Sequence, residues 1–320
     1  MPVEHPIIAL VVPCYNEEDA FPYALQELLS TLRKLTEAGN ISDKSYLFFI
    51  DDGSSDRTWQ LIERAHVDHP GRVRGLKLAR NAGHQNALLA GLTAQIGKTD
   101  ATISLDVDLQ DDISVIEQMI DRFVHQDADI VFGVRAARRS DTAFKRNTAT
   151  WYYRLLRWLG ADIIPDHADF RLMSDRALRA LAQFGEVHVF LRGLVTQLGF
   201  KREVVYFDRA RRLHGETKYS IPKMLALAVN GITSFSVRPL RLITAAGFIL
   251  FAAFLAVGVW VLVAWAAGET IQGWASVMLI FLLVSSFQTL ALGVIGEYVG
   301  KTYFEAKSRP RYIVEKEIST

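Results

Sequence analysis

Two long uncharged segments near the C-terminus constrain the fold of this 320-residue chain more than any other feature. Leu242 to Gly268 contains no charged residue, Thr270 to Gly296 contains none either, and Glu269 alone separates them. As a helix, each segment is long enough to cross about 30 Å of hydrocarbon. The alternative is two buried core helices. Tryptophans near the segment ends, Trp265 and Trp274, favour membrane spans because tryptophan is enriched at membrane interfaces.

Basic residues lie outside both segments and predict their orientation. They are Arg238 and Arg241 before the first segment, and Lys301, Lys307, Arg309 and Arg311 after the second. Positive residues are retained on the cytoplasmic side of a membrane. We therefore expect both termini in the cytoplasm and a short non-cytoplasmic loop around 268–273.

The remaining composition excludes some classes of protein. A net charge of +1 gives no reason to expect a nucleic-acid partner. The single cysteine, Cys14, cannot form an internal disulfide, which fits a reducing compartment. The first five residues are short and polar, so we expect no signal peptide.

Up to about residue 135, short apolar runs alternate with polar loops and helical patterns. The runs are 7–12, 46–50, 73–78, 101–105 and 130–134, and the first two are followed by helical patterns that end near Ala38 and Val67. This alternation predicts an α/β fold with a parallel, doubly wound sheet. Acidic residues follow three of the runs, and the carboxyl ends of parallel strands are where such sheets bind ligands.

The most concentrated acidic stretch is Asp106-Val107-Asp108-Leu109-Gln110-Asp111. Carboxylates this close repel one another unless a cation lies among them. Mg²⁺ and Mn²⁺ prefer oxygen ligands, and Mg²⁺ commonly binds one or two carboxylates together with substrate phosphates. We expect a metal–diphosphate site here. The alternative is a solvated acidic loop in which Asp111 or Asp112 caps the following helix.

Several polar motifs follow one another along the chain. They are Pro13-Cys14-Tyr15-Asn16-Glu17, Asp51-Asp52-Gly53-Ser54, the acidic stretch, Ala168-Asp169-Phe170-Arg171-Leu172-Met173-Ser174, Arg209-x-x-Arg212-x-x-Gly215-x-Thr217-Lys218, Gly231-Ile232-Thr233-Ser234-Phe235-Ser236 and Gly296-Glu297-Tyr298. In this order and spacing they resemble glycosyltransferase family 2, the inverting enzymes of GT-A (Rossmann-like) fold. The later motifs are similar to those of polyprenyl-phosphate glycosyltransferases, particularly bactoprenol glucosyltransferases and, more distantly, dolichol-phosphate mannose synthases.

The resemblance implies a membrane-anchored enzyme that moves a sugar from a UDP-sugar donor to undecaprenyl phosphate, for modification of cell-envelope glycans at the bacterial inner membrane. Glucose is the expected sugar. N-acetylglucosamine, galactose, or mannose from GDP-mannose, would use the same scaffold. A processive polysaccharide synthase and a non-catalytic membrane scaffold are also compatible with a membrane-anchored chain. The only string similar to the Q-x-x-R-W motif of synthases, Arg154 to Trp158, has arginine in place of the glutamine.

Roles for individual residues follow from the resemblance. It assigns the nucleotide-sugar to Pro13, Tyr15, Glu17, Asp52, Asp106 and Asp108, and the Mg²⁺ or Mn²⁺ ion to Asp106, Asp108 and Gln110. Asp51 is expected to be structural. Asp108 and Asp169 are the expected catalytic residues, with Asp169 as a base or as a residue that orients the acceptor, or alternatively as a partner of Arg171. The polar stretch Gly83-His84-Gln85-Asn86 is expected to line the donor pocket.

The phosphate of the lipid acceptor requires cations. Arginine suits phosphate because its planar donor fork makes paired hydrogen bonds. The expected residues are Arg135, Arg146, Arg209, Arg212 and Lys218. Trp151 to Leu159 mixes aromatic, leucine and arginine residues at helical spacing, so it is expected either in the headgroup region or packed on the soluble core.

These expectations combine into one organisation. The GT-A catalytic domain covers 1–220, an interfacial amphipathic helix 221–241, two transmembrane helices 242–296 and a cytoplasmic tail 297–320. Relatives suggest a homo-oligomer such as a tetramer.

Overall fold

The structure is a computed structural model that describes residues 4–135, 167–186, 191–207, 238–268 and 273–319. These residues belong to two compact units. The first contains the described residues up to 207 together with those from Arg309 onward, and the second contains the described residues from 238 to Ser308.

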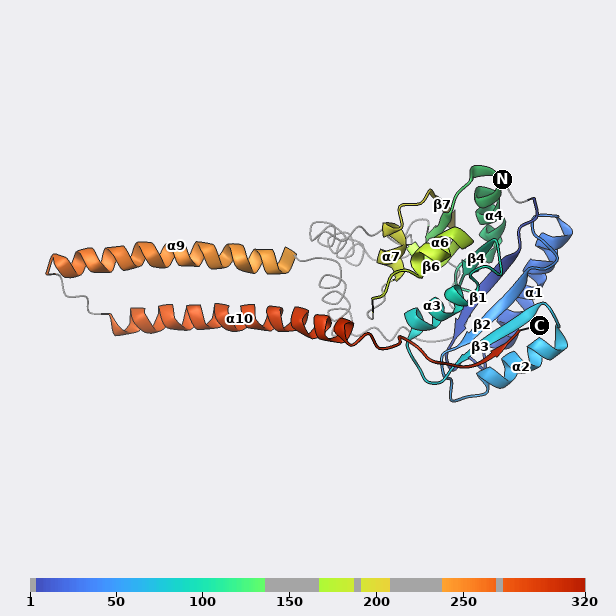
Figure 1. The fold of residues 1–320 in the computed structure, drawn as a ribbon, viewed down its shortest axis with the longest axis horizontal. Helices are drawn as coiled ribbons and strands as arrows, with labels where there is room; N and C mark the ends of the chain where they lie inside the picture. The colour runs from blue at the N-terminus through green and yellow to red at the C-terminus, as the bar shows by residue number, and fades with distance from the viewer. Residues whose placement is uncertain (1–3, 136–166, 187–190, 208–237, 269–272, 320) are drawn as a thin grey trace. The chain divides into compact units, whose positions relative to one another are not determined.

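The first unit is built on an eight-stranded sheet with the order β7-β5-β6-β4-β1-β2-β3-β8, counted over the described residues (Figure 1). The strands are β1 (Ile8–Cys14), β2 (Tyr46–Asp51), β3 (Val73–Leu78), β4 (Ala101–Ser104), β5 (Ile130–Arg135), β6 (His167–Ser174), β7 (Arg202–Phe207) and β8 (Val314–Ile318). Every residue of β1, β2 and β4 is buried, as expected for central strands covered on both faces.

All five strands predicted from apolar runs are confirmed as β1 to β5, but the prediction of a wholly parallel sheet is wrong. β6 pairs antiparallel with both β4 and β5, and β8 pairs antiparallel with β3. Hydrophobic runs show that a strand is buried but not which way it points. β8 is the last strand in the sheet order and is largely exposed. Its sequence, Val-Glu-Lys-Glu-Ile, is charged, so it carries no apolar signal.

Helices connect and cover the strands. They are α1 (Phe21–Glu37), α2 (Thr58–Asp68), α3 (His84–Ala94), α4 (Ile116–Gln126), α6 (Asp175–Leu181) and α7 (Leu191–Gln197), with the short 3-10 helix η1 (Ile113–Val115) before α4. In α1 the buried residues Phe21, Ala24, Leu28, Leu32 and Leu35 recur at helical spacing. They form one apolar stripe that packs on the sheet, which is why this segment folds as a helix.

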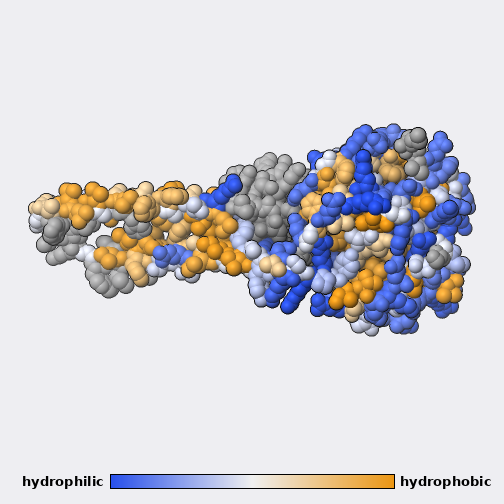
Figure 2. Space-filling model, viewed as in Figure 1, coloured by the Kyte–Doolittle hydropathy of each residue, from blue (hydrophilic) through white to orange (hydrophobic). Residues whose placement is uncertain are grey.

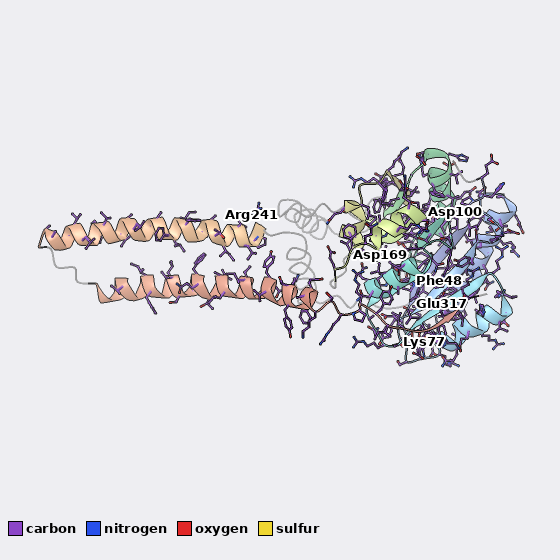
Figure 3. The ribbon with its side chains drawn as sticks, viewed as in Figure 1. Phe48, Lys77, Asp100, Asp169, Arg241 and Glu317 are labelled. Carbon is purple, nitrogen blue, oxygen red and sulfur yellow. The ribbon has the colours of Figure 1, made fainter. Side chains whose placement is uncertain are left out.

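The strands of the sheet end on two sides, called here the carboxyl-terminal edge and the opposite edge, and these two sides carry different side chains. Strands β1, β2 and β4 are parallel, so their polar carboxyl-terminal loops share one edge. β6 begins at the same edge, because Arg171 pairs with Ser104 at the end of β4. Asp169 therefore lies at the carboxyl-terminal edge, whereas Asp100, before β4, lies at the opposite one (Figure 3).

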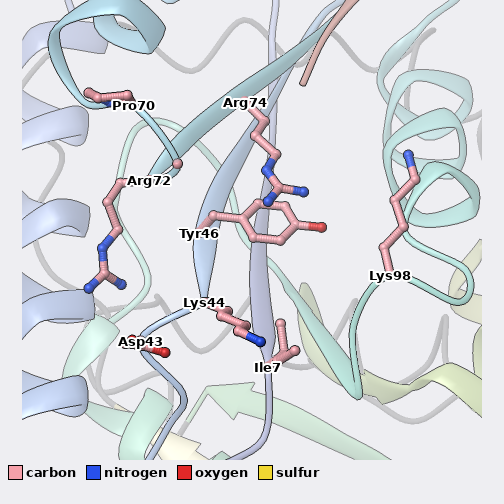
Figure 4. A pocket seen from close by; sticks show the side chains of 9 residues that line it. Ile7, Asp43, Lys44, Tyr46, Pro70, Arg72, Arg74 and Lys98 are labelled. Carbon is pink, nitrogen blue, oxygen red and sulfur yellow. The ribbon is translucent and has the colours of Figure 1, made fainter. Parts of the chain in front are cut away.

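The opposite edge carries a shallow cavity of about 380 Å³ (Figure 4). Arg74 lies over the Tyr46 ring, with its guanidinium carbon 3.7 Å from the ring centroid. The other lining residues are Ile7, Asp43, Lys44, Pro70, Gly71, Arg72 and Lys98. These residues precede strands or lie at their beginnings, so this cavity is remote from the predicted metal–diphosphate site.

The second unit contains α9 (Arg238–Ala266) and α10 (Trp274–Ala306), whose described surfaces are mostly hydrophobic (Figure 2). Among the described residues, one helical segment is long and apolar enough to cross a membrane. It is Pro239–Ala264; its most apolar 18-residue stretch has a mean hydropathy of 2.6, and none of that stretch is buried. Burial therefore does not explain its composition, in contrast to a core helix.

Candidate active site

The acidic stretch leaves β4 and turns back on itself. Leu109 has a φ of +45°, a left-handed conformation that non-glycine residues rarely adopt. The turn lets Gln110 Nε2 donate to Asp108 Oδ2 at 2.5 Å, and the Gln110 amide donates to Asp108 Oδ1 at 3.3 Å. Asp112 caps η1 by accepting from the Ser114 amide at 2.9 Å. The capping alternative is thus confirmed for Asp112, while Asp106 and Asp108 do not cap η1.

Asp106 lies among other carboxylates. Desolvation and the nearby charges of Asp169, Asp108 and Asp111 raise the pKa of Asp106 to about 6, against the opposing effect of His84. Such crowding stabilises any cation that binds between the carboxylates. The cluster therefore has the electrostatics that a divalent cation requires.

The donor set fits a hard cation that also binds phosphate. Within the described residues, no group of three or more His, Cys, Asp or Glu side chains is arranged to hold a metal ion. Asp106, Asp108 and the amide oxygen of Gln110 supply only oxygen donors, and two carboxylates completed by substrate phosphates are a usual environment for Mg²⁺. These residues could hold the ion together with a bound diphosphate.

Asp169 is buried and held by cationic donors. Arg171 Nη2 donates to Asp169 Oδ1 at 2.5 Å. Arg192 donates through Nε to Oδ1 and through Nη2 to Oδ2, both at 3.2 Å. Burial opposes ionisation, but a hydrogen bond from His84 and the charges of Arg171 and Arg192 hold the pKa of Asp169 well below its usual range. A carboxylate this stable as an anion is a poor proton acceptor, and its pairing with Arg171, one of the two sequence interpretations, is observed.

The loop before α3 supplies two further contacts to this carboxylate. Gln85 Nε2 donates to Asp169 Oδ2 at 3.2 Å, and Gln85 Oε1 accepts from the Leu191 amide at 3.1 Å. His84 Nε2 lies 3.5 Å from Asp169 Oδ2 and 3.6 Å from Asp106 Oδ1. The interactions of His84 with Asp169 and Asp106 outweigh its burial and raise its pKa. His84 therefore links the acidic stretch to Asp169.

Asp52 holds the same loop through hydrogen bonds to its backbone. Its carboxylate accepts from the Ala82 amide at 2.7 Å and from the Gly83 amide at 3.0 Å, and the residue is 2% exposed. Asp51 is fully buried and accepts from the Ser54 amide at 3.2 Å, as expected for a structural residue. The contact of Asp52 with a nucleotide stays a prediction, and its observed contacts position His84 and Gln85.

The other residues predicted for the donor end or follow β1. Tyr15 is 47% exposed, as a ring that flanks a ligand must be. Burial, followed by the charges of Asp108, Asp56 and Asp106, raises the pKa of Glu17, which indicates that Glu17 lies near the acidic stretch. Pro13 belongs to β1 itself. The loop after β1 thus comes to the same edge as the acidic stretch.

Most of the predicted lipid-phosphate residues lie outside the described residues. Arg146, Arg209, Arg212 and Lys218 fall there, as do the predicted interfacial segment 151–159 and residues 221–237 of the predicted interfacial helix 221–241. Residues 238–241 of that predicted helix belong to α9. Arg135 ends β5, which runs parallel to β4 and reaches the carboxyl-terminal edge.

Sequence reasoning missed one cation of the site, Arg192, and gave no specific role to His84 or Gln85. Arg192 follows a segment with no recognised motif, and it reaches Asp169 across 23 residues of chain. The only available signal was the unusual polarity of the stretch from Gly83 to Asn86. The partners of these side chains depend on how β6, α3 and α7 pack.

Comparison with known proteins identifies the family of the chain. The sequence profile of glycosyl transferase family 2 matches residues 9–182. An uncharacterized glycosyltransferase of Bacillus subtilis is 44% identical over 98% of this chain and 93% of its own length. A prophage bactoprenol glucosyl transferase homolog of Escherichia coli is 37% identical over 97% of this chain and 98% of its own length.

Similarity to solved structures is weaker. A mannosyltransferase from Pyrobaculum calidifontis, in complex with GDP-Man and Mn²⁺, aligns with a TM-score of 0.45 and 17% identity over 91% of this chain and 88% of its own. The matched family profile and the full-length sequence relatives, with the acidic stretch at the end of β4, lead to one conclusion: the chain belongs to glycosyl transferase family 2 and is a hexosyltransferase.

Proposed function

We propose that the protein transfers glucose, with inversion, from UDP-glucose to a polyprenyl phosphate on the cytoplasmic side of a bacterial membrane. The observation that carries this proposal is the pairing of an acidic centre, Asp106 and Asp108, with a cationic one around Asp169, bridged by His84. Relatives named bactoprenol glucosyl transferases, which match over 97% of this chain, support the acceptor class and the sugar.

A bound divalent cation would balance the negative charge of the acidic centre. Asp106, Asp108 and Gln110 would hold Mg²⁺ or Mn²⁺, which supplies Lewis-acid stabilisation of the departing diphosphate. Glu17, Tyr15 and Pro13 would position the nucleotide at the end of β1. His84 would keep Asp106 oriented, since its ring contacts both Asp106 and Asp169.

Asp169 would act as a positioning residue. A polyprenyl phosphate is already largely ionised near neutral pH, because the second pKa of such phosphates is about 6. Its attack on the anomeric carbon therefore needs orientation more than proton removal. The lowered pKa of Asp169 and its two arginine partners support this role over that of a base.

The sheet topology supports two membrane crossings. β8 pairs with β3 in the same sheet as β1, although α9 and α10 lie between them in the chain. If α9 crosses a membrane, the chain must cross it again before β8, because all strands of one sheet lie on one side. α10 is the described helix that would make the second crossing, with both termini cytoplasmic.

The test is transfer from labelled UDP- and GDP-sugars to undecaprenyl phosphate by the purified full-length protein, with Mg²⁺ or Mn²⁺ and with chelator. We expect metal-dependent labelling of the lipid from UDP-glucose, and its loss in Asp108→Ala. Asp68→Ala, which removes a carboxylate at the end of α2, is the matched control and should retain activity.

Other outcomes would contradict parts of the proposal. Labelling that survives chelator and the Asp108 substitution would refute the metal role. A long polymer would indicate a processive synthase, and labelling from another sugar donor would refute glucose. No transfer from any donor would favour a scaffold.

A further inference from the structure

We propose that Asn16 is a positioning residue of the nucleotide site and holds Tyr15 and Glu17 in the orientation that binds the uridine of the donor. The inference rests on the proposed function, because it assigns a role within the site predicted for UDP-glucose. The motif resemblance gives roles to the two neighbours of Asn16 and none to Asn16 itself.

The backbone of Asn16 has a left-handed conformation. Its φ is +52°, in a region that asparagine and aspartate enter more readily than other residues with a Cβ atom. Asn16 lies directly between Tyr15 and Glu17, in the loop that joins β1 to α1. Left-handed residues other than glycine persist where the surrounding structure holds them, and they are concentrated at functional sites. A change of φ at Asn16 would alter the directions of both neighbouring side chains.

The side chain of Asn16 binds the loop 52–57, which follows β2. Asn16 Oδ1 accepts from the Ser55 amide at 2.8 Å and from Ser55 Oγ at 3.2 Å. The Asn16 amide donates in turn to Ser54 Oγ at 3.0 Å. The two loops lie side by side because β1 and β2 are parallel neighbours in the sheet. Asn16 is therefore fixed to the second loop by both its side chain and its backbone.

The next two amides of the first loop are held in the same way. The Glu17 amide donates to Thr58 Oγ1 at 2.9 Å, and the Glu18 amide donates to Asp56 Oδ2 at 3.1 Å. These acceptors are themselves fixed, because Thr58 is fully buried and its Oγ1 donates to Asp56 Oδ1 at 2.6 Å. Among the described residues, the side chains of Tyr15 and Glu17 make no hydrogen bond, so both can contact a ligand.

The first loop thus has a fixed backbone and two available side chains. Prior positioning of this kind lowers the entropic cost of orienting a ligand. A loop that spends part of its time in another conformation binds more weakly, in proportion to the fraction of molecules that are correctly arranged. Once the nucleotide is bound, all molecules have the correct arrangement. We therefore expect Asn16 to affect binding of the donor and not the subsequent transfer step.

Asp127 provides a matched control. It also has a left-handed backbone, with a φ of +51°, at the C-terminal end of α4. It precedes β5 and so lies at the opposite edge of the sheet. Replacing either residue by alanine leaves a Cβ atom in the left-handed region and removes a side chain that tolerates this conformation. The cost to folding should be similar, whereas only Asn16 adjoins the predicted nucleotide site.

The variants Asn16→Ala, Asn16→Gly and Asp127→Ala would be compared in the full-length protein. Steady-state kinetics would give kcat and the KM for UDP-glucose at saturating undecaprenyl phosphate. Calorimetry in the presence of Mn²⁺ would measure the affinities for UDP and UMP, with GDP in parallel. Thermal unfolding would monitor folding.

We expect Asn16→Ala to raise the KM for UDP-glucose by roughly 5- to 10-fold, the cost of one left-handed residue with a Cβ atom, and to leave kcat unchanged. Asn16→Gly keeps the backbone conformation and loses only the bonds to Oδ1, so the KM should rise only about two- to threefold. The affinities for UDP and UMP should fall by the same factor, because both ligands contain the uridine. Asp127→Ala should change none of these values.

The inference is overturned if Asn16→Ala and Asp127→Ala give the same KM for UDP-glucose. It is also overturned if Asn16→Ala binds UDP no more weakly than Asn16→Gly, since the left-handed backbone would then have no role. Failure of the proposed function would look different. In that case the wild type would not label the lipid from UDP-glucose, whereas the calorimetric binding of UDP or GDP would still report on Asn16.

Discussion

Two buried aspartates, Asp169 and Asp129, make nearly the same contact at opposite edges of one sheet. Each is 5% exposed and accepts two bonds from an arginine, the half-buried Arg192 in one case and the exposed Arg176 in the other. Asp169 also contacts Arg171 and Gln85, with His84 close by, whereas Asp129 also accepts from Ser174 Oγ at 2.9 Å. The ion pair alone therefore does not identify a functional site.

The surroundings of each pair decide its role. Asp169 lies near the start of the antiparallel strand β6, beside the end of β4, so it is next to the acidic stretch. Asp129 precedes β5 and lies beside the end of β6, where its pair with Arg176 ties that strand to α6. The position of each pair relative to the acidic stretch therefore distinguishes the two aspartates, although their contacts with arginine are alike.

The largest difference in stability and in transfer activity is expected between the variants Asp169→Asn and Asp129→Asn. Asp169→Asn leaves Arg171 buried without its ionic partner, a change that typically costs about 3–5 kcal/mol. Arg176 is 63% exposed and can be rehydrated, so we expect Asp129→Asn to cost only about 1–2 kcal/mol. Thermal unfolding in detergent would measure both, and transfer should fall at least about 100-fold in Asp169→Asn alone. Equal costs in the two variants would contradict the comparison.

A smaller effect is expected from the neutral partners, Gln85 and Ser174. Gln85→Leu removes two hydrogen bonds and should lower kcat/KM about tenfold, roughly the value of one such bond. Ser174→Ala removes the bond to Asp129 and the cap of α6, where Ser174 Oγ accepts from the Ala177 amide at 3.1 Å. It should reduce stability by about 1 kcal/mol and leave transfer unchanged. A comparable loss of transfer in Ser174→Ala would show that the opposite edge also affects catalysis.

The crowding of carboxylates around Asp106 predicts that the free energy of unfolding depends on pH. Asp106 has a folded-state pKa of about 6, above the roughly 3.9 of an unfolded aspartate, so the folded protein binds the additional proton between these values. In chelator, the contribution of Asp106 to the free energy of unfolding should therefore rise as pH falls from about 7 to about 4.

Asp106→Asn should remove this pH-dependent part. This part should amount to about 1 kcal/mol of unfolding free energy. It is smaller than the pKa shift alone would give, because the Asp106 side chain is 43% exposed and solvent screens its charge. Thermal unfolding across this pH range would test it, with Asp68→Asn as the control for loss of a surface carboxylate. Identical pH profiles for wild type and Asp106→Asn would exclude the effect.

The smallest effect is expected for an ion pair exposed to solvent. Arg179 Nε lies 2.6 Å from Asp175 Oδ2, with side chains 56% and 26% exposed. Arg179→Gln should cost about 0.5 kcal/mol or less in thermal unfolding and leave transfer unchanged. A cost similar to that of Asp169→Asn would mean that burial does not determine the strength of these pairs.

Local patterns in the chain were enough to predict the elements that bury apolar surface. The apolar runs identified β1 to β5, and the resemblance of the motifs to glycosyl transferase family 2 is confirmed by the family profile. These features could be predicted because strand burial and local motifs depend on residues close together in the chain. The charged edge strand β8 gave no comparable signal, because its pairing with β3 joins residues about 240 positions apart.

The partners of Asp169 depended on packing between distant segments. The antiparallel direction of β6 brings Asp169 beside Asp106, and the docking of α3 and α7 supplies Gln85 and Arg192 from 84 and 23 residues away. The chain alone allowed Asp169 to be a base, an orienting residue or a partner of Arg171. Tertiary packing decided its charge state, because the pKa of a buried carboxylate depends on the cations that the fold places around it.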